Sequence, residues 1–374
     1  MRVIFTCGGT AGHINPALAL AKGIQERRPG TEVLFVGAAG DSMESHLVPQ
    51  AGFPLRQVNI NSFRRKLNAE GLRHNLMAAK NIFRSRRQAA AILDEFRPDL
   101  VVGTGGFASY PVTREAARRG VPTAIHESNA LPGMTTKALA GMVDVVMVGF
   151  EAAKAHYSRA KRVEVTGTPV RPDFYRFTCA EAREKLGIPR EEPVALCFWG
   201  SLGAAHMNEY MEDFMALAVK DGVPFRLIQG AGRSYAKMAE HLRERGIDLG
   251  QYPRLELREY IYDMPAAMAC SDLVLCRAGA ATLSEVAAVS KPAILVPSPN
   301  VTADHQTKNA RVLSGSGGAI LLPESECSGK ALYRLVTELL ADRPRRESMS
   351  RALSALSVTD AAEEIYRVLR SVMV

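Results

Sequence analysis

Short apolar runs alternate with longer stretches rich in Ala, Leu, Glu and Arg along most of the chain. The apolar runs have the length of buried strands, and the stretches between them have the composition of helices. This alternation predicts an α/β protein with parallel sheets that are covered by helices on both faces. The predicted strands are residues 3–7, 33–37, 99–103, 122–126, 143–149 and 163–167 in a first series, and 194–200, 224–230, 254–260, 272–277, 292–297 and 319–323 in a second.

The two series are separated near Thr166–Asp173, where one glycine and two prolines interrupt regular structure. Two series of strands predict two doubly wound domains, over residues 1–167 and 168–358. A last helix follows within residues 359–374. The pattern leaves open whether this helix packs on the second domain or returns to the N-terminal one.

Composition places few limits beyond this. The chain has 374 residues, of which 47% are hydrophobic and 23% charged, which is enough for two ordinary cores. Its six cysteines form no CxxC pair and have no His at zinc-ligand spacing, so we expect a reducing compartment without disulfides or structural zinc. The N-terminus begins with a strand, and no apolar run approaches ~18 residues, so neither a signal peptide nor a membrane span is expected.

The net charge of +8 is concentrated in one segment. Between Asn61 and Gln88 there are eight Lys or Arg residues against one acid, Glu70, and the rest of the chain holds 39 basic and 38 acidic residues. A local excess of this kind predicts a local anionic partner.

Four glycine-rich turns follow predicted strands, over residues 8–13, 103–106, 200–204 and 277–285. The first joins its strand to a helix that is expected to begin near Asn15-Pro16. Open α/β sheets bind ligands at the carboxyl ends of their strands, where helix N-termini attract phosphate. None of the turns matches GxGxxG or GxxxxGK[ST], which argues against a dehydrogenase or an ATPase. Any one of them alone is equally consistent with a tight turn that binds nothing.

Taken together, the glycine-rich turns resemble one enzyme family in order and spacing. The motifs are GGTAGHINP (8–16), GTGGFASYP (103–111), HESNALPG (126–133), GTPVR (167–171), GSLGA (200–204), RAGAATLSE (277–285) and DHQTKNA (304–310). Over residues 1 to about 325 the chain is similar to the MurG family of N-acetylglucosaminyltransferases.

The resemblance implies a GT-B fold, with two Rossmann-like domains facing a cleft. It implies inverting transfer of GlcNAc from UDP-GlcNAc to the 4-hydroxyl of MurNAc in lipid I, an undecaprenyl-linked acceptor, which gives lipid II for peptidoglycan synthesis. It also implies a peripheral enzyme on the cytoplasmic face of the cell membrane, with no metal and no cofactor. The absence of an Asp-x-Asp pair from the sequence agrees with metal-independent transfer.

The same resemblance implies roles for individual residues. His13 matches the catalytic base, and an imidazole can accept a proton at neutral pH. Residues that match positions binding the donor are Thr10, Ala11, Gly12, Asn129, Arg171, Ser201, Ile261, Ala280, Ala281, Thr282, Leu283, Ser284, Glu285 and Gln306. Among them Glu285 matches the carboxylate on the ribose hydroxyls, Arg171 the cation beside the leaving diphosphate, and Ile261 the backbone that reads uracil. Each also has a plain structural explanation, such as a helix cap for Ser201 or a solvated helix residue for Glu285.

Four positions depart from the family pattern: Ser128, Thr168, Trp199 and Leu202. Because an apolar Leu202 replaces a glutamine beside the phosphates, three alternatives stay open. They are a GT-B transferase acting on another lipid such as diacylglycerol, a sugar-nucleotide epimerase, and an inactive binding scaffold.

The basic segment predicts contact with an anionic membrane surface. From Leu72 an apolar stripe at helical spacing is flanked by cations, which is typical of interfacial helices. We place the contact mainly at Phe63, Arg64, Arg65, Lys66 and Leu67. The alternative is a helix that covers the sheet, with its apolar face in the core. Nucleic acid is not expected, because no stacking aromatics lie among the basic residues.

Overall fold

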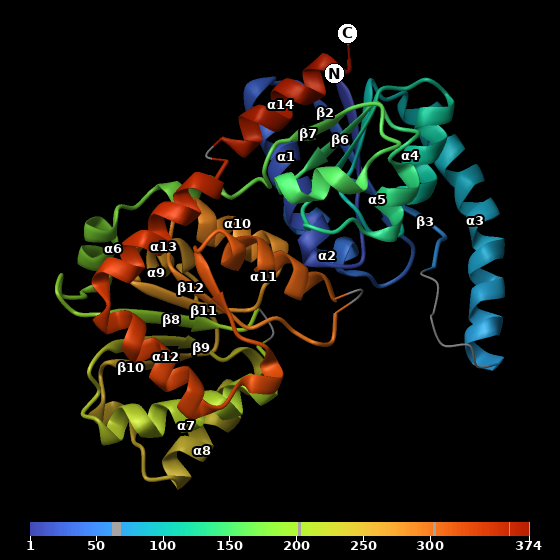
Figure 1. Ribbon diagram of the computed structural model, residues 1–374. Coiled ribbons are helices and arrows are strands. Elements are labelled where there is room, and N and C mark those ends of the chain that lie inside the picture. Colours follow the sequence, from blue (N-terminus) through green and yellow to red (C-terminus); the bar gives the residue numbers. More distant parts are fainter. Residues whose placement is uncertain (62–68, 201–202, 302–303, 359, 374) are drawn as a thin grey trace. The chain divides into compact units, whose positions relative to one another are not determined.

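The computed structural model describes residues 1–61, 69–200, 203–301, 304–358 and 360–373, without the side chains of residues 69–80, 82 and 83. The chain forms two compact units (Figure 1). The first consists of Met1–Val170 together with Val358–Val374, and the second of Arg171–Ser357. Each unit is described below by itself.

The first unit is built on a parallel sheet with the strand order β3-β2-β1-β4-β5-β6-β7. Its inner strands are continuous apolar runs with both faces covered, as in doubly wound sheets. The strands are β1 (Arg2–Thr6), β2 (Glu32–Ala38), β3 (Leu55–Val58), β4 (Leu100–Gly103), β5 (Thr123–Glu127), β6 (Val145–Val148) and β7 (Val163–Val165).

Helices cover both faces of this first sheet. On one face, α1 (Ala11–Arg27), α2 (Met43–Gln50) and α14 (Ala361–Ser371) bury apolar residues against Val3 and Phe5 of β1. On the other face, α3 (Ala69–Phe96) and α4 (Ser109–Arg118) pack on Ile4 and Val101, and α5 (Met134–Leu139) packs on Ile125 and Val146. The side chains of the first sheet therefore face helices in alternation.

The C-terminal helix α14 packs on the first unit. Ile365, Val368 and Leu369 are buried in the same core as residues of α1. Arg27 of α1 donates from Nε to Glu363 at 2.7 Å. The chain thus returns after the second unit to complete one face of the first sheet.

Two local features of the first unit differ from the sequence-based expectation. Strand β3 was not predicted, because it is an edge strand in which Arg56 and Gln57 are exposed and no apolar run marks it. Helix α1 begins at Ala11 rather than near Asn15-Pro16, because Gly9 (φ +86°) turns the chain and the carbonyl of Thr10 already accepts the N–H groups of His13 and Ile14.

The second unit repeats the architecture with the strand order β10-β9-β8-β11-β12-β13. Its strands, again parallel, are β8 (Val194–Phe198), β9 (Arg226–Gly230), β10 (Leu255–Arg258), β11 (Leu273–Cys276), β12 (Ala293–Leu295) and β13 (Ala319–Leu321). The helices are α6 (Cys179–Leu186), α7 (Ala205–Lys220), α8 (Tyr235–Glu244), α9 (Met264–Cys270), α10 (Ala280–Ala288), α11 (His305–Gly315), α12 (Gly329–Ala341) and α13 (Arg343–Leu356). The core on the α7, α8 and α12 side contains Trp199, the only tryptophan of the chain.

Short 3-10 helices connect several of these elements. Those in the described residues include η1 (Glu151–His156), η2 (Pro172–Tyr175), η3 (Gly232–Ser234), η4 (Leu249–Gln251) and η6 (Glu324–Glu326).

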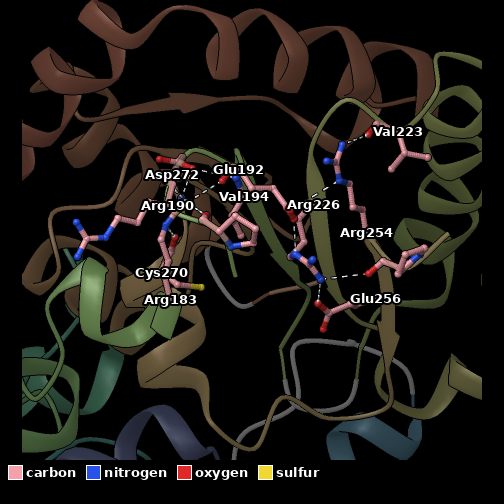
Figure 2. A network of polar contacts seen from close by, with 12 residues as sticks. Arg183, Arg190, Glu192, Val194, Val223, Arg226, Arg254, Glu256, Cys270 and Asp272 are labelled. Atoms are coloured by element: carbon pink, nitrogen blue, oxygen red, sulfur yellow. Dashed lines mark hydrogen bonds and ion pairs between the residues drawn. The ribbon is translucent and has the colours of Figure 1, made fainter. Parts of the chain in front are cut away.

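A network of arginines and carboxylates ties together the amino ends of strands in the second sheet (Figure 2). Arg183 of α6 is almost fully buried, and its Nη2 donates to Asp272, immediately before β11, at 2.8 Å. Asp272 also accepts the N–H of Val194, the first residue of β8, at 2.9 Å. Beside them Arg226 of β9 pairs with Glu192 and Glu256 at 2.5 and 2.6 Å. These contacts lie at the edge of the sheet opposite to the carboxyl ends, where ligands bind in such folds.

Candidate active site

The first two glycine-rich turns lie together at the carboxyl edge of the first sheet. They follow the neighbouring strands β1 and β4. At Gly106 (φ +81°) a Cβ atom would lie 2.1 Å from the carbonyl oxygen of Gly8, so only glycine fits there. The hydroxyl of Thr104 donates to the backbone carbonyl of His13 at 2.7 Å. The sheet therefore joins the GGTAGH and GTGGF motifs into one structure.

His13, the predicted base, has a fixed ring orientation in this structure. Its Nδ1 lies 2.9 Å from the carbonyl oxygen of Gly8, and Thr10 Oγ1 lies 3.3 Å from the same nitrogen. A carbonyl only accepts, so the proton of the neutral ring is on Nδ1, and Nε2 carries the lone pair. The ring packs against Gly105, where a Cβ would come within 2.7 Å of His13 Cδ2. This arrangement presents an unprotonated Nε2, as a general base requires.

The predicted residues Thr10, Ala11 and Gly12 form the N-terminus of α1. Thr10 is the N-cap in an extended conformation, and its side chain makes no capping hydrogen bond. A 17-residue helix with an uncapped first turn presents backbone N–H groups and partial positive charge. The site can therefore attract an anionic group close to His13.

Two buried residues that sequence reasoning missed organise the HESNALPG loop. The carboxylate of Glu127 accepts hydrogen bonds from the backbone N–H and Nδ2 of Asn129 at 3.0 and 2.8 Å, and from Thr136 Oγ1 at 2.6 Å. His126 lies 2.8 Å from the carbonyl oxygen of Gly167, and burial lowers the pKa of its imidazole. Asn129 is therefore held in place by Glu127. The motif letters contained this signal, a carboxylate two residues before an asparagine in a tight loop.

In the second unit, the RAGAATLSE motif forms the turn after β11 and the start of α10. Gly279 is the N-cap without a side-chain cap, and the predicted donor-binding residues Ala280, Ala281, Thr282, Leu283, Ser284 and Glu285 form the first turns of the helix. Gln306 Oε1 accepts the N–H groups of Ala278 and Ser298 at 3.3 and 2.8 Å. Its acceptor oxygen is thus engaged by the backbone, which leaves the amide nitrogen as the group to donate to a ligand.

Glu285 has the electrostatic character of a functional residue. Burial raises the pKa of its carboxyl group to about 7, the nearby Arg171 guanidinium acts in the opposite direction, and Asp173 adds to the rise. Arg171 itself is exposed, 3.6 Å from Asp173 and stacked over Phe174. A carboxylate that is poorly solvated in the folded protein is typical of a binding or catalytic site.

We expect Glu285→Gln to stabilise the second unit at pH 8 and to leave it unchanged at pH 4. Because the pKa in the folded state is above the usual value of 4.5, the stability that the protonated group provides is lost as the pH rises toward 7. The difference corresponds to about 3 kcal/mol at pH 8. Urea unfolding followed by Trp199 fluorescence measures it, and equal midpoints for both proteins at pH 8 would contradict it.

The remaining predicted residues are placed as follows. Ile261 follows β10 and is buried, and it lies against Gly230, where a Cβ would come within 3.1 Å of its Cδ1. Ser201 and Leu202 lie outside the described residues, as do Phe63, Arg64, Arg65, Lys66 and Leu67. The apolar stripe from Leu72 lies among side chains that are also outside the description. Trp199, one of the departures from the family pattern, is buried, and the guanidinium of Arg277 lies over its ring.

Two Rossmann-like units with these turns at their carboxyl edges define the GT-B class of glycosyltransferases. Residues 3–148 match the glycosyltransferase family 28 N-terminal domain, and residues 194–365 match the C-terminal domain of the same family. The chain belongs to glycosyltransferase family 28, within the MurG family of N-acetylglucosaminyltransferases.

Relatives match over the full length. The UDP-N-acetylglucosamine--N-acetylmuramyl-(pentapeptide) pyrophosphoryl-undecaprenol N-acetylglucosamine transferase of Acetivibrio thermocellus is 38% identical, covering 100% of this chain and 98% of the relative. The enzyme of that name from Desulfitobacterium hafniense is 39% identical over 98% of each chain. Among solved structures, Acinetobacter baumannii MurG superposes with a TM-score of 0.78 at 26% identity, covering 99% of both chains.

The fold alone is shared more widely. A putative UDP-N-acetylglucosamine 2-epimerase from Listeria monocytogenes matches with a TM-score of 0.66 at 14% identity, covering 99% of this chain and 96% of that structure. Fold similarity therefore does not separate a transferase from an epimerase, whereas full-length identity to the transferases does.

Proposed function

We propose that this enzyme transfers GlcNAc from UDP-GlcNAc to the 4-hydroxyl of MurNAc in undecaprenyl-pyrophosphoryl-MurNAc-pentapeptide, giving lipid II. The observation that carries the proposal is the full-length identity to transferases named for this donor and acceptor. The geometry of His13 supports it, because transfer to a sugar hydroxyl needs a base with a free lone pair.

In the proposed mechanism His13 Nε2 takes the proton of the acceptor hydroxyl. The hydroxyl oxygen attacks the anomeric carbon of GlcNAc, the bond from that carbon to the β-phosphate oxygen breaks, and UDP leaves with its electron pair. A single displacement of this kind inverts the configuration at the anomeric carbon. The uncapped N-terminus of α10 and the guanidinium of Arg171 stabilise the charge of the departing diphosphate without a metal.

The remaining predicted residues bind the donor. Glu285 accepts hydrogen bonds from the two ribose hydroxyls, which its ionised form favours. Gln306 donates from its amide nitrogen and Asn129 supplies its amide group to the sugar hydroxyls. The backbone of Ile261 reads the uracil edge, while Ser201 contacts the diphosphate.

The test is UDP release from UDP-GlcNAc in the presence of a short-chain lipid I analogue. Release that requires this acceptor supports the proposal. Release with diacylglycerol instead would assign the enzyme to another lipid acceptor, and isomerisation of the donor alone would make it an epimerase. No release and no isomerisation, with intact donor binding, would indicate a binding scaffold.

We further propose that the enzyme acts as a peripheral protein at the cytoplasmic face of the membrane. The eight basic residues of 61–88 support this, and in the described residues no helix is long and apolar enough to cross a bilayer. We expect co-sedimentation with vesicles containing anionic lipid, and a marked loss of binding in 0.5 M salt or with neutral vesicles. Equal binding to neutral vesicles would contradict an electrostatic contact.

A further inference from the structure

A buried carboxylate lies directly beneath the turn that holds His13. Glu44, the second residue of α2, has no solvent exposure. Its Oε2 accepts the N–H of Gly9 at 3.2 Å, and its Oε1 accepts the N–H of Ala38 at the end of β2 at 3.1 Å. No Lys or Arg of the described residues forms an ion pair with it. A buried carboxylate is costly compared with an apolar side chain of similar size, so its presence requires a reason.

The surrounding backbone leaves room for this carboxylate and for nothing larger. A Cβ on Gly8 would lie 2.7 Å from Glu44 Oε1, and a Cβ on Gly37 would lie 2.6 Å from Glu44 Cγ. Burial raises the pKa of the neighbouring Cys7 thiol far above its usual value, and the charge of Glu44 adds to the rise, so Cys7 is neutral. Glu44 is therefore confined between two glycines, with backbone N–H groups as its donors.

One peptide group connects Glu44 to the proposed base. The N–H of Gly9 and the carbonyl of Gly8 belong to the same planar amide, and they point in opposite directions. The N–H donates to Glu44, and the carbonyl accepts from Nδ1 of His13 at 2.9 Å. A hydrogen bond from the N–H to a carboxylate polarises the amide and strengthens its carbonyl as an acceptor.

We propose that Glu44 is a positioning residue for the transfer reaction, acting on His13 through the Gly8–Gly9 peptide. Glu44 fixes the plane of this amide and increases the negative charge on the Gly8 carbonyl. That carbonyl holds the proton on Nδ1 and stabilises the imidazolium after Nε2 has accepted the proton of the acceptor. The arrangement has the logic of the aspartate in a Ser-His-Asp triad, with one peptide group inserted between carboxylate and imidazole. The inference rests on the proposed function, since it assumes that His13 is the base.

The central test is Glu44→Gln, alone and combined with His13→Ala. A neutral amide accepts more weakly, and it must turn an NH₂ group toward one of the two backbone donors. We expect kcat to fall about 10- to 100-fold, as is usual when the group that orients an active residue is lost. The acid limb of the pH–rate profile moves to lower pH, and the donor KM changes little. In the His13→Ala background, Glu44→Gln causes no further loss.

Two companions separate positioning from a general effect on folding. Gly37→Ala displaces the Glu44 side chain without altering its chemistry, and we expect it to give the same kinetic defect. Glu115→Gln removes a buried carboxylate far from this turn, which three arginines of α3 and α4 surround. This control lowers stability but leaves the pH profile in place.

A readout that does not need turnover distinguishes this inference from the proposed function. In protein labelled with ¹⁵N-histidine, His13 shows the tautomer with the proton on Nδ1, and Glu44→Gln increases the population protonated on Nε2. Absence of UDP release by the unmodified enzyme would overturn the function and leave this tautomer result standing. Wild-type kcat and an unmoved acid limb in Glu44→Gln, or a loss that adds fully to that of His13→Ala, would overturn the role of Glu44.

Discussion

Replacing His13 by Ala is expected to lower kcat for UDP release about 10²- to 10⁴-fold, the usual contribution of a general base. Donor affinity should change little, because the ring acts on the acceptor hydroxyl. Stability should fall by no more than about 1 kcal/mol, since one hydrogen bond to Gly8 is lost. Single-turnover kinetics with a lipid I analogue, together with a thermal melt, measure both quantities.

Two variants make the interpretation of this result specific. His13→Gln can still donate to the Gly8 carbonyl but has no basic nitrogen, so we expect it to be as inactive as His13→Ala. The matched control is His46→Ala, which removes an exposed histidine of the same unit that pairs with Asp41 at 2.5 Å. It should keep kcat within about twofold, as is usual for a surface pair. A His13→Ala enzyme with kcat within threefold of wild type would remove the base from the mechanism.

The sequence predicted the architecture well because the signals are local. Inner strands of a parallel sheet are apolar over their whole length, and the turns that follow them are rich in glycine. The edge strand β3 has no such signal, since its exposed Arg56 and Gln57 satisfy the surface rather than the core. The start of α1 depends on a positive φ at Gly9, which the letters allow but do not dictate.

The residues that support the site could not be predicted in the same way. Glu44 and His126 act on backbone groups 35 and 41 residues away in the chain, and those pairings exist only after the sheet has formed. The polarity of Gln306 was equally hidden, because the backbone donors at Ala278 and Ser298 decide which end of its amide remains for a ligand. Short motifs therefore identify the reacting groups, whereas tertiary contacts identify the groups that hold them.

Arg183→Met is expected to destabilise the second unit by about 3–5 kcal/mol, the usual effect of removing one partner from a buried ion pair. The guanidinium of Arg183 donates to the carbonyls of Pro189, Arg190, Glu192 and Cys270 as well as to Asp272. Methionine keeps much of the volume but satisfies none of these acceptors, and it leaves the Asp272 carboxylate with the N–H of Val194. The loss exceeds that of any single surface pair because several buried carbonyls lose their donor together.

The single tryptophan makes this prediction measurable in a protein with two units. Trp199 is buried in the second unit, so its fluorescence in urea follows that unit alone, while far-UV circular dichroism follows both. The matched control is Arg343→Met, which removes an exposed arginine that pairs with Glu347 four residues later, and it should cost less than about 0.5 kcal/mol. Because Arg183 lies at the amino edge of the sheet, the folded variant should bind UDP-GlcNAc as the wild type does. A fluorescence midpoint equal to that of Arg343→Met, or lost donor binding in fully folded Arg183→Met, would show that the two edges of this sheet do not divide stability from function.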